Sequence, residues 1–476
     1  MKGLCFNPYL PSWEYVPDGE PHVFGDRLYI YGSHDKCGGT RYCEENYVCW
    51  SAPVDNLADW RYEGVIYRKD QDPLNTDGKI DLYAPDAAQG PDGRYYLFYA
   101  LWLSGTVSVA VSDSPAGPFD FYGHVHYPDG SPVDGGVRFD PAILVEEGGN
   151  YLYYGFCPPG HFPDMGPNPN LGAYMVQLED DMLTIRTRPV CVARGYEGKD
   201  GTDFEAHPFF EASSIRHYGD LYYFVYSSLQ GHELCYATAA TPQGRFAYRG
   251  VIISNGDIGY KGSMEPKSFY ANNHGGLVQV GEDCYIFYHR HTHGTHFSRQ
   301  GCAEKVEIQA NGWIPQVEMT SCGLNKGLLP VGNCYPAYII CDLLGPKGAD
   351  KIPSRPPYPA DAPCLLDEPD PACEKGTHLF LHNLHNGTCC AVKYLDFDAA
   401  KADSVSLTLR GSAAKVEVRL DSAEGLVAAE VCSEAGENWR AFTAAMSPVQ
   451  GSHSVWFCFL LEDEDSSADF SAFEIH

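Results

Sequence analysis

The sequence predicts an all-β protein, a five-bladed β-propeller followed by a C-terminal β-sandwich. Three observations support this prediction. Aromatic residues make up 13% of the chain beside 49 glycines and 34 prolines, an aromatic strand pattern recurs five times, and seven further strand-like segments end the chain. Aromatic residues favour strands, and glycine and proline favour the tight turns that join them.

The composition also limits the kinds of partner. The 476 residues include 33 Lys+Arg and 63 Asp+Glu, a formal net charge of -30. A nucleic acid or an anionic membrane surface attracts a basic face, so we expect neither as a partner. No apolar run approaches the roughly 18 residues of a membrane helix, and the start of the chain lacks the apolar core of a secretory signal. We therefore expect a cytoplasmic protein whose 18 scattered cysteines are reduced thiols.

Five segments share a turn glycine followed by an alternating, aromatic-rich strand. Their glycines are 56 to 70 residues apart, at Gly25, Gly93, Gly149, Gly219 and Gly281. A short apolar stretch before each glycine is typical of the first strand of a hairpin, and two more polar strands follow. Five such four-stranded units form a β-propeller around a central channel. Unrelated hairpins of a sandwich would explain the aromatic content but not the regular recurrence.

A polar residue opens the first strand of each unit. Counting back from the turn glycines gives Asp18, Asp86, Asp140, Glu211 and His274. The first strand of a propeller blade lines the channel, so we expect these side chains to converge at one end of the axis. One such acid is ordinarily a turn residue. Four carboxylates in register repel each other and raise each other's pKa, which is typical of an active site.

Converging carboxylates favour glycosidic-bond hydrolysis, because the sequence has no nucleophile elbow, phosphate loop or thiolate site. This chemistry needs one protonated acid for the leaving oxygen and one ionised carboxylate on the opposite side. A third carboxylate beside the acid would raise its pKa and hold it in place.

At these residues the chain resembles glycoside hydrolase family 43, whose members are five-bladed propellers. The resemblance covers roughly residues 5–330 and includes the segments NPYLPSWEYVPDGEPHVFGDRLYIYGS, RFDPAILVEEGGNYLYYG and FFEASSIRHYGDLYYFVYSS. It implies an inverting reaction with Asp18 as general base and Glu211 as general acid. It also implies that Asp140 modulates the pKa of the acid.

The chain departs from the family pattern beside these acids. Glycine rather than proline follows Asp18, Ala-Ser rather than Gly-Pro follows Glu211, and Tyr83 stands where tryptophan is common. The acids themselves are retained, so we expect the reaction to be retained and the sugar pocket to differ. Glu205 is a rival acid, but it lies too far before its turn glycine to open the same strand.

The resemblance also implies residues that bind the sugar. In YAPDAAQGPDGRYYLFYA we expect Tyr83 to stack on the sugar and Asp86 to bind a sugar hydroxyl rather than act as a third catalyst. Arg299, in FSRQGCAEKVEI, aligns with a family arginine that holds substrate hydroxyls. A plain surface arginine is the alternative.

The chemistry itself needs no cofactor, but the resemblance implies a possible structural calcium ion on the propeller axis. His274, in NNHGG, matches the family's axial histidine, which is often close to calcium and binds it directly or through water. A hydrogen-bonded histidine without metal is the alternative. The run HRHTHGTH, residues 289–296, lacks a cysteine or carboxylate at metal-site spacing, so we expect a loop at the channel rim.

The C-terminal part divides into two segments. Proline and acidic residues without a regular period predict a Pro-rich linker over residues 331–376, and seven short strands predict a jelly-roll β-sandwich over residues 377–476. The segments AVKYLDF, NWRAF and GSHSVWFCF resemble carbohydrate-binding module family 6, which implies Trp439 and Tyr394 as sugar platforms. Asp469 stands where an asparagine ligand is usual. A purely structural sandwich with Trp439 in its core is the alternative.

The family resemblance implies an inverting exo-glycosidase that acts on oligosaccharides of plant cell-wall hemicellulose. It would remove terminal pentose units as an α-L-arabinofuranosidase, a β-xylosidase or both. The same fold and mechanism could serve β-galactofuranosyl or β-galactosyl substrates. A non-catalytic carbohydrate-binding propeller is a third interpretation, which the acid, base and modulator in register argue against.

Overall fold

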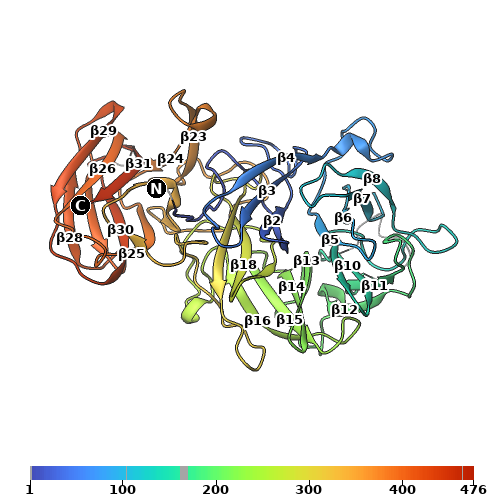
Figure 1. Cartoon of the computed structure of the whole chain (residues 1–476). Coiled ribbons are helices and arrows are strands. Elements are labelled where there is room, and N and C mark those ends of the chain that lie inside the picture. Colours follow the sequence, from blue (N-terminus) through green and yellow to red (C-terminus); the bar gives the residue numbers. More distant parts are fainter. Residues whose placement is uncertain (1–2, 103, 161–169, 464) are drawn as a thin grey trace.

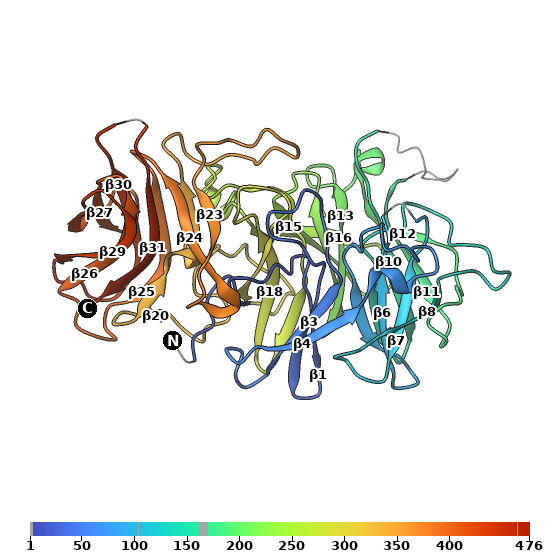
Figure 2. The same cartoon turned by 90° about the horizontal axis from the view of Figure 1, so that it is seen from above.

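The computed structural model describes residues 3–102, 104–160, 170–463 and 465–476. Over these residues the chain forms five small sheets and, beside them, two larger sheets near the C-terminus (Figures 1 and 2). The helical segments are short 3-10 turns, η1 (Lys69–Gln71), η2 (Tyr196–Gly198), η3 (Tyr260–Gly262), η4 (Ala337–Ile339) and η5 (Glu374–Gly376). None of the helical segments in this part of the chain is long and apolar enough to cross a lipid bilayer.

The five small sheets are antiparallel, and each strand pairs with the next one along the chain. The first sheet contains β1 (Glu20–Phe24), β2 (Arg27–Tyr31), β3 (Tyr47–Pro53) and β4 (Arg61–Tyr67). The second contains β5 (Asp86–Gln89), β6 (Tyr95–Tyr99), β7 (Ser108–Ser112) and β8 (Asp120–His124). The third contains β9 (Ala142–Glu146), β10 (Gly149–Tyr154), β11 (Gly172–Leu178) and β12 (Val190–Arg194).

The fourth sheet contains β13 (Phe209–Tyr218), β14 (Leu221–Ser228), β15 (Glu233–Ala239) and β16 (Ala247–Ser254). The fifth has three strands, β17 (Leu277–Val280), β18 (Asp283–Arg290) and β19 (Gln300–Val306). The first strand of each sheet lies beside the first strand of the next, and β17 returns to lie beside β1. This cyclic order closes a ring around a channel, which confirms the predicted five-bladed propeller.

The turn glycines occupy the positions that the repeat predicts: four lie between the first two strands of their blades, and Gly149 is the first residue of β10. Gly25, Gly219 and Gly281 have φ values of 61°, 60° and 63°, in the left-handed region that favours glycine. The strands that follow them pack their tyrosines between blades, where Tyr31, Tyr153 and many others are fully buried. The local turn chemistry and the aromatic strands thus generate the repeated hairpin.

The C-terminal unit is a sandwich of two sheets. One sheet has the order β20 (Leu329–Pro330), β25 (Cys389–Asp396), β30 (Ser452–Leu460), β27 (Lys415–Leu420) and β28 (Val427–Cys432), with β22 (Asp342–Leu344) also on β25. The other has the order β23 (Cys364–Pro369), β24 (Thr377–Leu384), β31 (Ala468–Ile475), β26 (Ser404–Gly411) and β29 (Gly436–Ala445), with β21 (Cys334–Pro336) also on β31. Alternate residues of β26 and β27, including Val405 and Val418, are buried in one core.

The structure corrects the prediction of a linker over residues 331–376. This segment contributes β21, β22 and β23 to the two sheets of the sandwich. Its middle part runs along the propeller. Lys351 forms an isolated parallel β-bridge with Tyr270, and the backbone N–H of Leu365 donates to the carbonyl oxygen of Thr292. Prolines interrupt the segment, and short edge strands of this kind carry no period that the sequence alone reveals.

Propeller and sandwich meet through a buried polar interface. The Nζ atom of Lys393 on β25 lies 2.9 Å from Asp257 Oδ2, 3.1 Å from Glu318 Oε1 and 2.9 Å from Asp342 Oδ1. The neighbouring Tyr394 hydroxyl donates to Glu318 Oε2 at 2.7 Å. Asp257 and Glu318 belong to the propeller side, so these charges join the two units.

Candidate active site

A cavity of about 320 Å³ brings together residues from the whole length of the propeller. Six of the nine predicted site residues line it: Asp18, Tyr83, Asp140, Glu211, His274 and Arg299. The three acids come from the first, third and fourth blades, so the convergence expected from the repeat is present in the structure. Asp86, Tyr394 and Trp439 lie elsewhere.

The backbone is unusual where the acids enter the cavity. Asp18 and Asp140 precede β1 and β9 and have φ values of 56° and 44°, and Ala212, next to Glu211, has a φ of 68°. The pairing of β13 with β14 shifts register on both sides of Glu211, as in a β-bulge. Positive φ values cost energy in residues other than glycine, and bulges re-aim side chains beside functional sites.

Asp18 is held as a carboxylate. Arg299 Nη1 donates to its Oδ1 at 2.8 Å, and the pKa of Asp18 is well below its ordinary value. Burial opposes ionisation, but the charge of the Arg299 guanidinium outweighs it. An ionised, positioned carboxylate is what a general base requires.

Arg299 has a role at Asp18 that the family resemblance does not imply. It is almost fully buried, and its Nε and Nη2 atoms donate to the two carboxylate oxygens of Asp35 at 2.8 and 3.0 Å. This bidentate pair fixes the guanidinium, which in turn fixes Asp18. Arg299 is therefore a positioning residue that also lines the cavity, and contact with substrate hydroxyls stays a prediction.

Asp35 and His289 are missing from the predicted site. The backbone N–H of Asp18 donates to His289 Nδ1 at 3.3 Å, and His289 Nε2 lies 2.9 Å from the Asn272 carbonyl oxygen. Because the carbonyl can only accept, Nε2 carries the proton, and burial lowers the pKa of His289. His289 lies on β18 rather than in a rim loop, and only His296 of the histidine run lines the cavity.

Glu211 and Asp140 hold protons more tightly than ordinary carboxyls. Burial and the charge of Asp18 raise the pKa of Glu211 to about 8. Burial and the charges of Glu211 and Asp18 raise the pKa of Asp140 well above its usual value. The backbone N–H of Ala212 donates to Asp140 Oδ2 at 2.9 Å, so Asp140 is tied to the strand that carries Glu211.

The two candidates for the general acid differ in position. Glu211 is half-buried and lines the cavity, whereas Glu205 is exposed and absent from the lining. The structure thus brings Glu211, and not its rival, to the other two acids.

Aromatic rings form part of the cavity wall. Tyr83 stacks on Trp102 with ring centroids 5.0 Å apart, and Phe139 packs against both. Phe156 and Phe210 extend this wall. Tyr83 therefore has the expected place, and Trp102, which follows the second strand of its blade, is an aromatic platform that the sequence reasoning missed.

The prediction for Asp86 is corrected. It is fully buried outside the cavity lining, with Oδ1 2.6 Å from His22 Nε2 and Oδ2 accepting from the Ile143 N–H at 2.8 Å. The β5–β6 turn holds five residues where the β1–β2 turn holds two. Asp86 consequently corresponds to Glu20 inside β1 and not to Asp18, so it cannot serve as the predicted sugar ligand.

His274 lines the cavity as a neutral histidine. Burial lowers its pKa to about 4, and its Nδ1 lies 3.7 Å from Asp140 Oδ2 and 4.0 Å from Asp18 Oδ1. Calcium prefers six to eight oxygen ligands. Asp18 already accepts a hydrogen bond from Arg299, and Asp140 accepts one from a backbone N–H. Among the described residues, His274 belongs to no group of three or more potential metal-binding side chains whose ligand atoms lie within 4.8 Å of one another. These residues do not fit direct ligation of calcium by His274, and calcium held through water stays a prediction.

The sandwich residues do not present open sugar platforms. Arg410 Cζ lies 4.3 Å from the ring centroid of Trp439, whose Nε1 donates to Glu368 Oε1 at 2.9 Å. Tyr394 is engaged at the interface with the propeller. The resemblance to a carbohydrate-binding module stays a prediction, and these two side chains favour the alternative of a structural sandwich.

The predicted linker also reaches the cavity. Lys351 and Ser354 belong to its lining, and the Ile352 carbonyl lies 3.1 Å from His296 Nε2. The segment between the two units thus closes one part of the cavity rim.

Comparison with known proteins agrees with this geometry. The model of the family "Glycosyl hydrolases family 43" matches residues 15–314. A xylosidase/arabinosidase of Thermoclostridium stercorarium is 46% identical over 476 aligned positions, which cover 96% of this chain and 97% of that protein.

Two solved structures extend the comparison. A family 43 β-xylosidase/α-arabinofuranosidase from a compost microbial metagenome, in complex with xylotriose, is 26% identical with a TM-score of 0.52, covering 66% of this chain and 98% of its own. A family 43 arabinoxylan arabinofuranohydrolase from Bacillus subtilis, 22% identical with a TM-score of 0.52, covers 100% of this chain and 98% of its own and shows the shared fold. The resemblance derived from the motifs is confirmed: the chain is a glycoside hydrolase and belongs to glycoside hydrolase family 43.

Proposed function

We propose that the protein is an inverting exo-glycosidase that releases terminal pentose units, as a β-xylosidase, an α-L-arabinofuranosidase or both. One observation carries the mechanism. Two carboxyls in one cavity have pKa values moved in opposite directions, with Asp18 below its ordinary value and Glu211 at about 8. Opposite protonation states at neutral pH are what an acid and a base in the same reaction need.

In the proposed step, Glu211 gives its proton to the leaving oxygen as the glycosidic bond breaks. A water molecule forms the new bond to the anomeric carbon from the opposite face, and Asp18 accepts the proton of that water. Asp18 ends protonated and Glu211 ionised, and exchange with solvent restores both. Arg299 stabilises the Asp18 carboxylate, and His274, being neutral, adds no competing charge.

The pentose assignment is supported by the relatives. The protein of Thermoclostridium stercorarium is named a xylosidase/arabinosidase. A cavity whose wall includes the aromatic rings of Tyr83 and Trp102 and the closing residues Lys351 and Ser354 suits the end of a sugar chain better than its middle.

Product analysis tests the proposal. Arabino- and xylo-oligosaccharides are incubated with the enzyme, and the released sugar and its anomer are followed by proton NMR. We expect a free pentose from the chain end, with the anomeric configuration inverted at first. Retention of configuration, or cleavage only of galactosyl or galactofuranosyl substrates in a panel of aryl glycosides, would contradict the proposal.

A further inference from the structure

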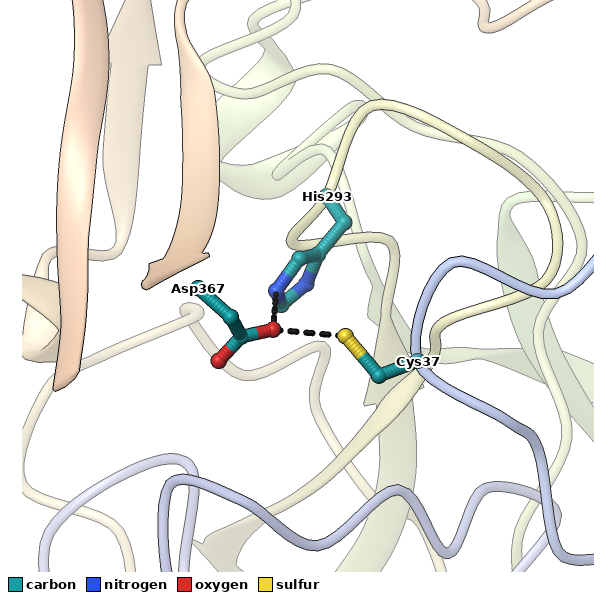
Figure 3. A group of neighbouring side chains, drawn as sticks. All are labelled: Cys37, His293 and Asp367. Carbon is teal, nitrogen blue, oxygen red and sulfur yellow. Dashed lines mark hydrogen bonds and ion pairs between the residues drawn. The ribbon is translucent and has the colours of Figure 1, made fainter. Parts of the chain in front are cut away.

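Three side chains from distant parts of the chain converge between the propeller and the sandwich. Cys37 comes from the β2–β3 loop, His293 from the β18–β19 loop and Asp367 from β23 (Figure 3). Cys37 Sγ lies 2.6 Å and His293 Nε2 lies 3.1 Å from Asp367 Oδ2. One potential ligand atom of each residue lies within 4.8 Å of the other two.

The donor set suits a borderline-soft divalent metal. Thiolate sulfur, imidazole nitrogen and carboxylate oxygen are the ligand types of protein zinc sites. Tetrahedral zinc with bond lengths of about 2.0–2.3 Å places neighbouring ligand atoms roughly 3.4–3.6 Å apart. The His293–Asp367 pair is already close to this spacing. The Cys37 sulfur would move outward by about 1 Å, which its exposed position before two glycines allows.

Two further contacts prepare the cluster for a cation. Thr292 Oγ1 lies 2.9 Å from His293 Nδ1, so the other ring nitrogen faces Asp367 in the way that metal-bound histidines are oriented. Asp367 Oδ2, the carboxylate oxygen that faces Cys37 and His293 (Figure 3), also accepts from the Tyr15 hydroxyl at 2.7 Å. This oxygen therefore attracts donors from two side chains, and a bound cation would take their place.

We propose that Cys37, His293 and Asp367 bind a single divalent transition-metal ion of the zinc class, with water in the fourth position. Packing around the thiol and its hydrogen bond to Asp367 raise the pKa of Cys37 to about 12. The metal-free thiol is therefore protonated, and binding releases that proton to solvent as the metal–sulfur bond forms. The site does not rest on the proposed glycosidase function.

The position of the site gives it a structural consequence. The loop that carries Cys37 also carries Tyr42 and Cys43, and the loop that carries His293 also carries His296. Tyr42, Cys43 and His296 line the active-site cavity. A metal ion bound here would join β23 of the sandwich to both loops and so hold one wall of the cavity in place.

Metal binding to the full-length protein tests the proposal directly. After treatment with a chelator and desalting, the protein is titrated with Co²⁺ and then with Zn²⁺. We expect one equivalent of Co²⁺ with the near-ultraviolet band of a sulfur–cobalt bond, its displacement by Zn²⁺, and a rise in Tm of a few degrees with saturating Zn²⁺. Cys37→Ser and Asp367→Asn should lower the affinity at least about 100-fold, whereas the exposed Cys432→Ser should bind as the wild type does.

Two outcomes would overturn the proposal. Absence of the sulfur–cobalt band in the wild type would mean that the three side chains form a hydrogen-bonded cluster only. Unchanged binding in both Cys37→Ser and Asp367→Asn would place the metal elsewhere, for example at His207, Glu233 and Cys235. The Tm of each variant without metal serves as the folding control, and the two separate variants keep the test valid if one fails to fold.

Discussion

Two regions of this molecule each gather three carboxylates around one buried cation, and they differ in how the cation is placed. At the interface, Lys393 Nζ contacts Asp257, Glu318 and Asp342 at 2.9–3.1 Å. In the cavity, the guanidinium of Arg299 contacts Asp18 at 2.8 Å and otherwise turns to Asp35.

The difference in placement separates a structural cluster from a chemical one. Lys393 contacts all three of its acids and joins the sandwich to the propeller, although burial still raises the pKa of Asp257 to about 6. Arg299 contacts one cavity acid, Asp18, and at Asp140 and Glu211 burial and the charges of neighbouring acids outweigh its effect on the pKa. An uncompensated carboxyl in a buried site holds its proton, which is the state that a general acid needs.

The largest expected effect follows from removing the proton-transfer groups of the cavity. Glu211→Gln and Asp18→Asn should each lower kcat/KM on aryl pentosides by about 10²–10⁴-fold, since a positioned acid or base typically contributes that much. The Tm of Glu211→Gln should stay close to that of the wild type, whereas Asp18→Asn should lower it, since Arg299 then keeps only its pair with Asp35. Turnover at the wild-type level in either variant would remove that residue from the mechanism.

At the interface the same kind of change should act on stability. Lys393→Met leaves the buried Asp257 and Asp342 and the half-buried Glu318 without their cation, and breaking a buried ion pair costs about 3–5 kcal/mol. We expect a lower free energy of unfolding in denaturant titrations, with kcat unchanged for the folded fraction. Lys401→Met is the control, because Lys401 pairs with Asp403 at the exposed surface and should change stability by less than about 1 kcal/mol.

The pH dependence should distinguish the two acids of the cavity. The reactive form needs Glu211 protonated and Asp18 ionised. Because the pKa of Glu211 is raised to about 8, kcat/KM should fall about tenfold per pH unit above that value. The pKa of Asp18 is lowered, so no acidic limb from Asp18 should appear above about pH 4. Lys393→Met should leave this profile unchanged, and a basic limb near pH 5 would contradict the assignment.

The smallest effects are expected from a pair of tryptophans, one in each unit. Trp102→Ala removes an aromatic surface from the cavity wall and should raise KM about 3–10-fold with a smaller change in kcat. Trp439→Ala should leave both KM and the binding of soluble xylan or arabinan unchanged, because Arg410 covers its ring. Weaker polysaccharide binding in the Trp439 variant would restore the carbohydrate-binding interpretation of the sandwich.

Much of the fold was predictable because the signals are local. The turn glycines and tyrosine-rich strands repeat at nearly even spacing, and Asp18, Asp140 and Glu211 precede or enter first strands at similar offsets. The same counting failed for Asp86, because the β5–β6 turn is longer and Asp86 is the first residue of β5, as Glu20 is of β1. Sequence reasoning also failed over residues 331–376. There the short strands form because they pair with strands of the sandwich, and the local sequence does not show this pairing.

The sequence by itself determined the number of blades, the hairpin at the start of each blade and the three acids that meet at the channel, since turn preference and strand alternation act over a few residues. Only the tertiary structure decided which acid is ionised. That state depends on Arg299, which lies 281 residues from Asp18 in the chain and reaches it at 2.8 Å. Electrostatic interactions depend on separation in space, and no local pattern encodes that separation.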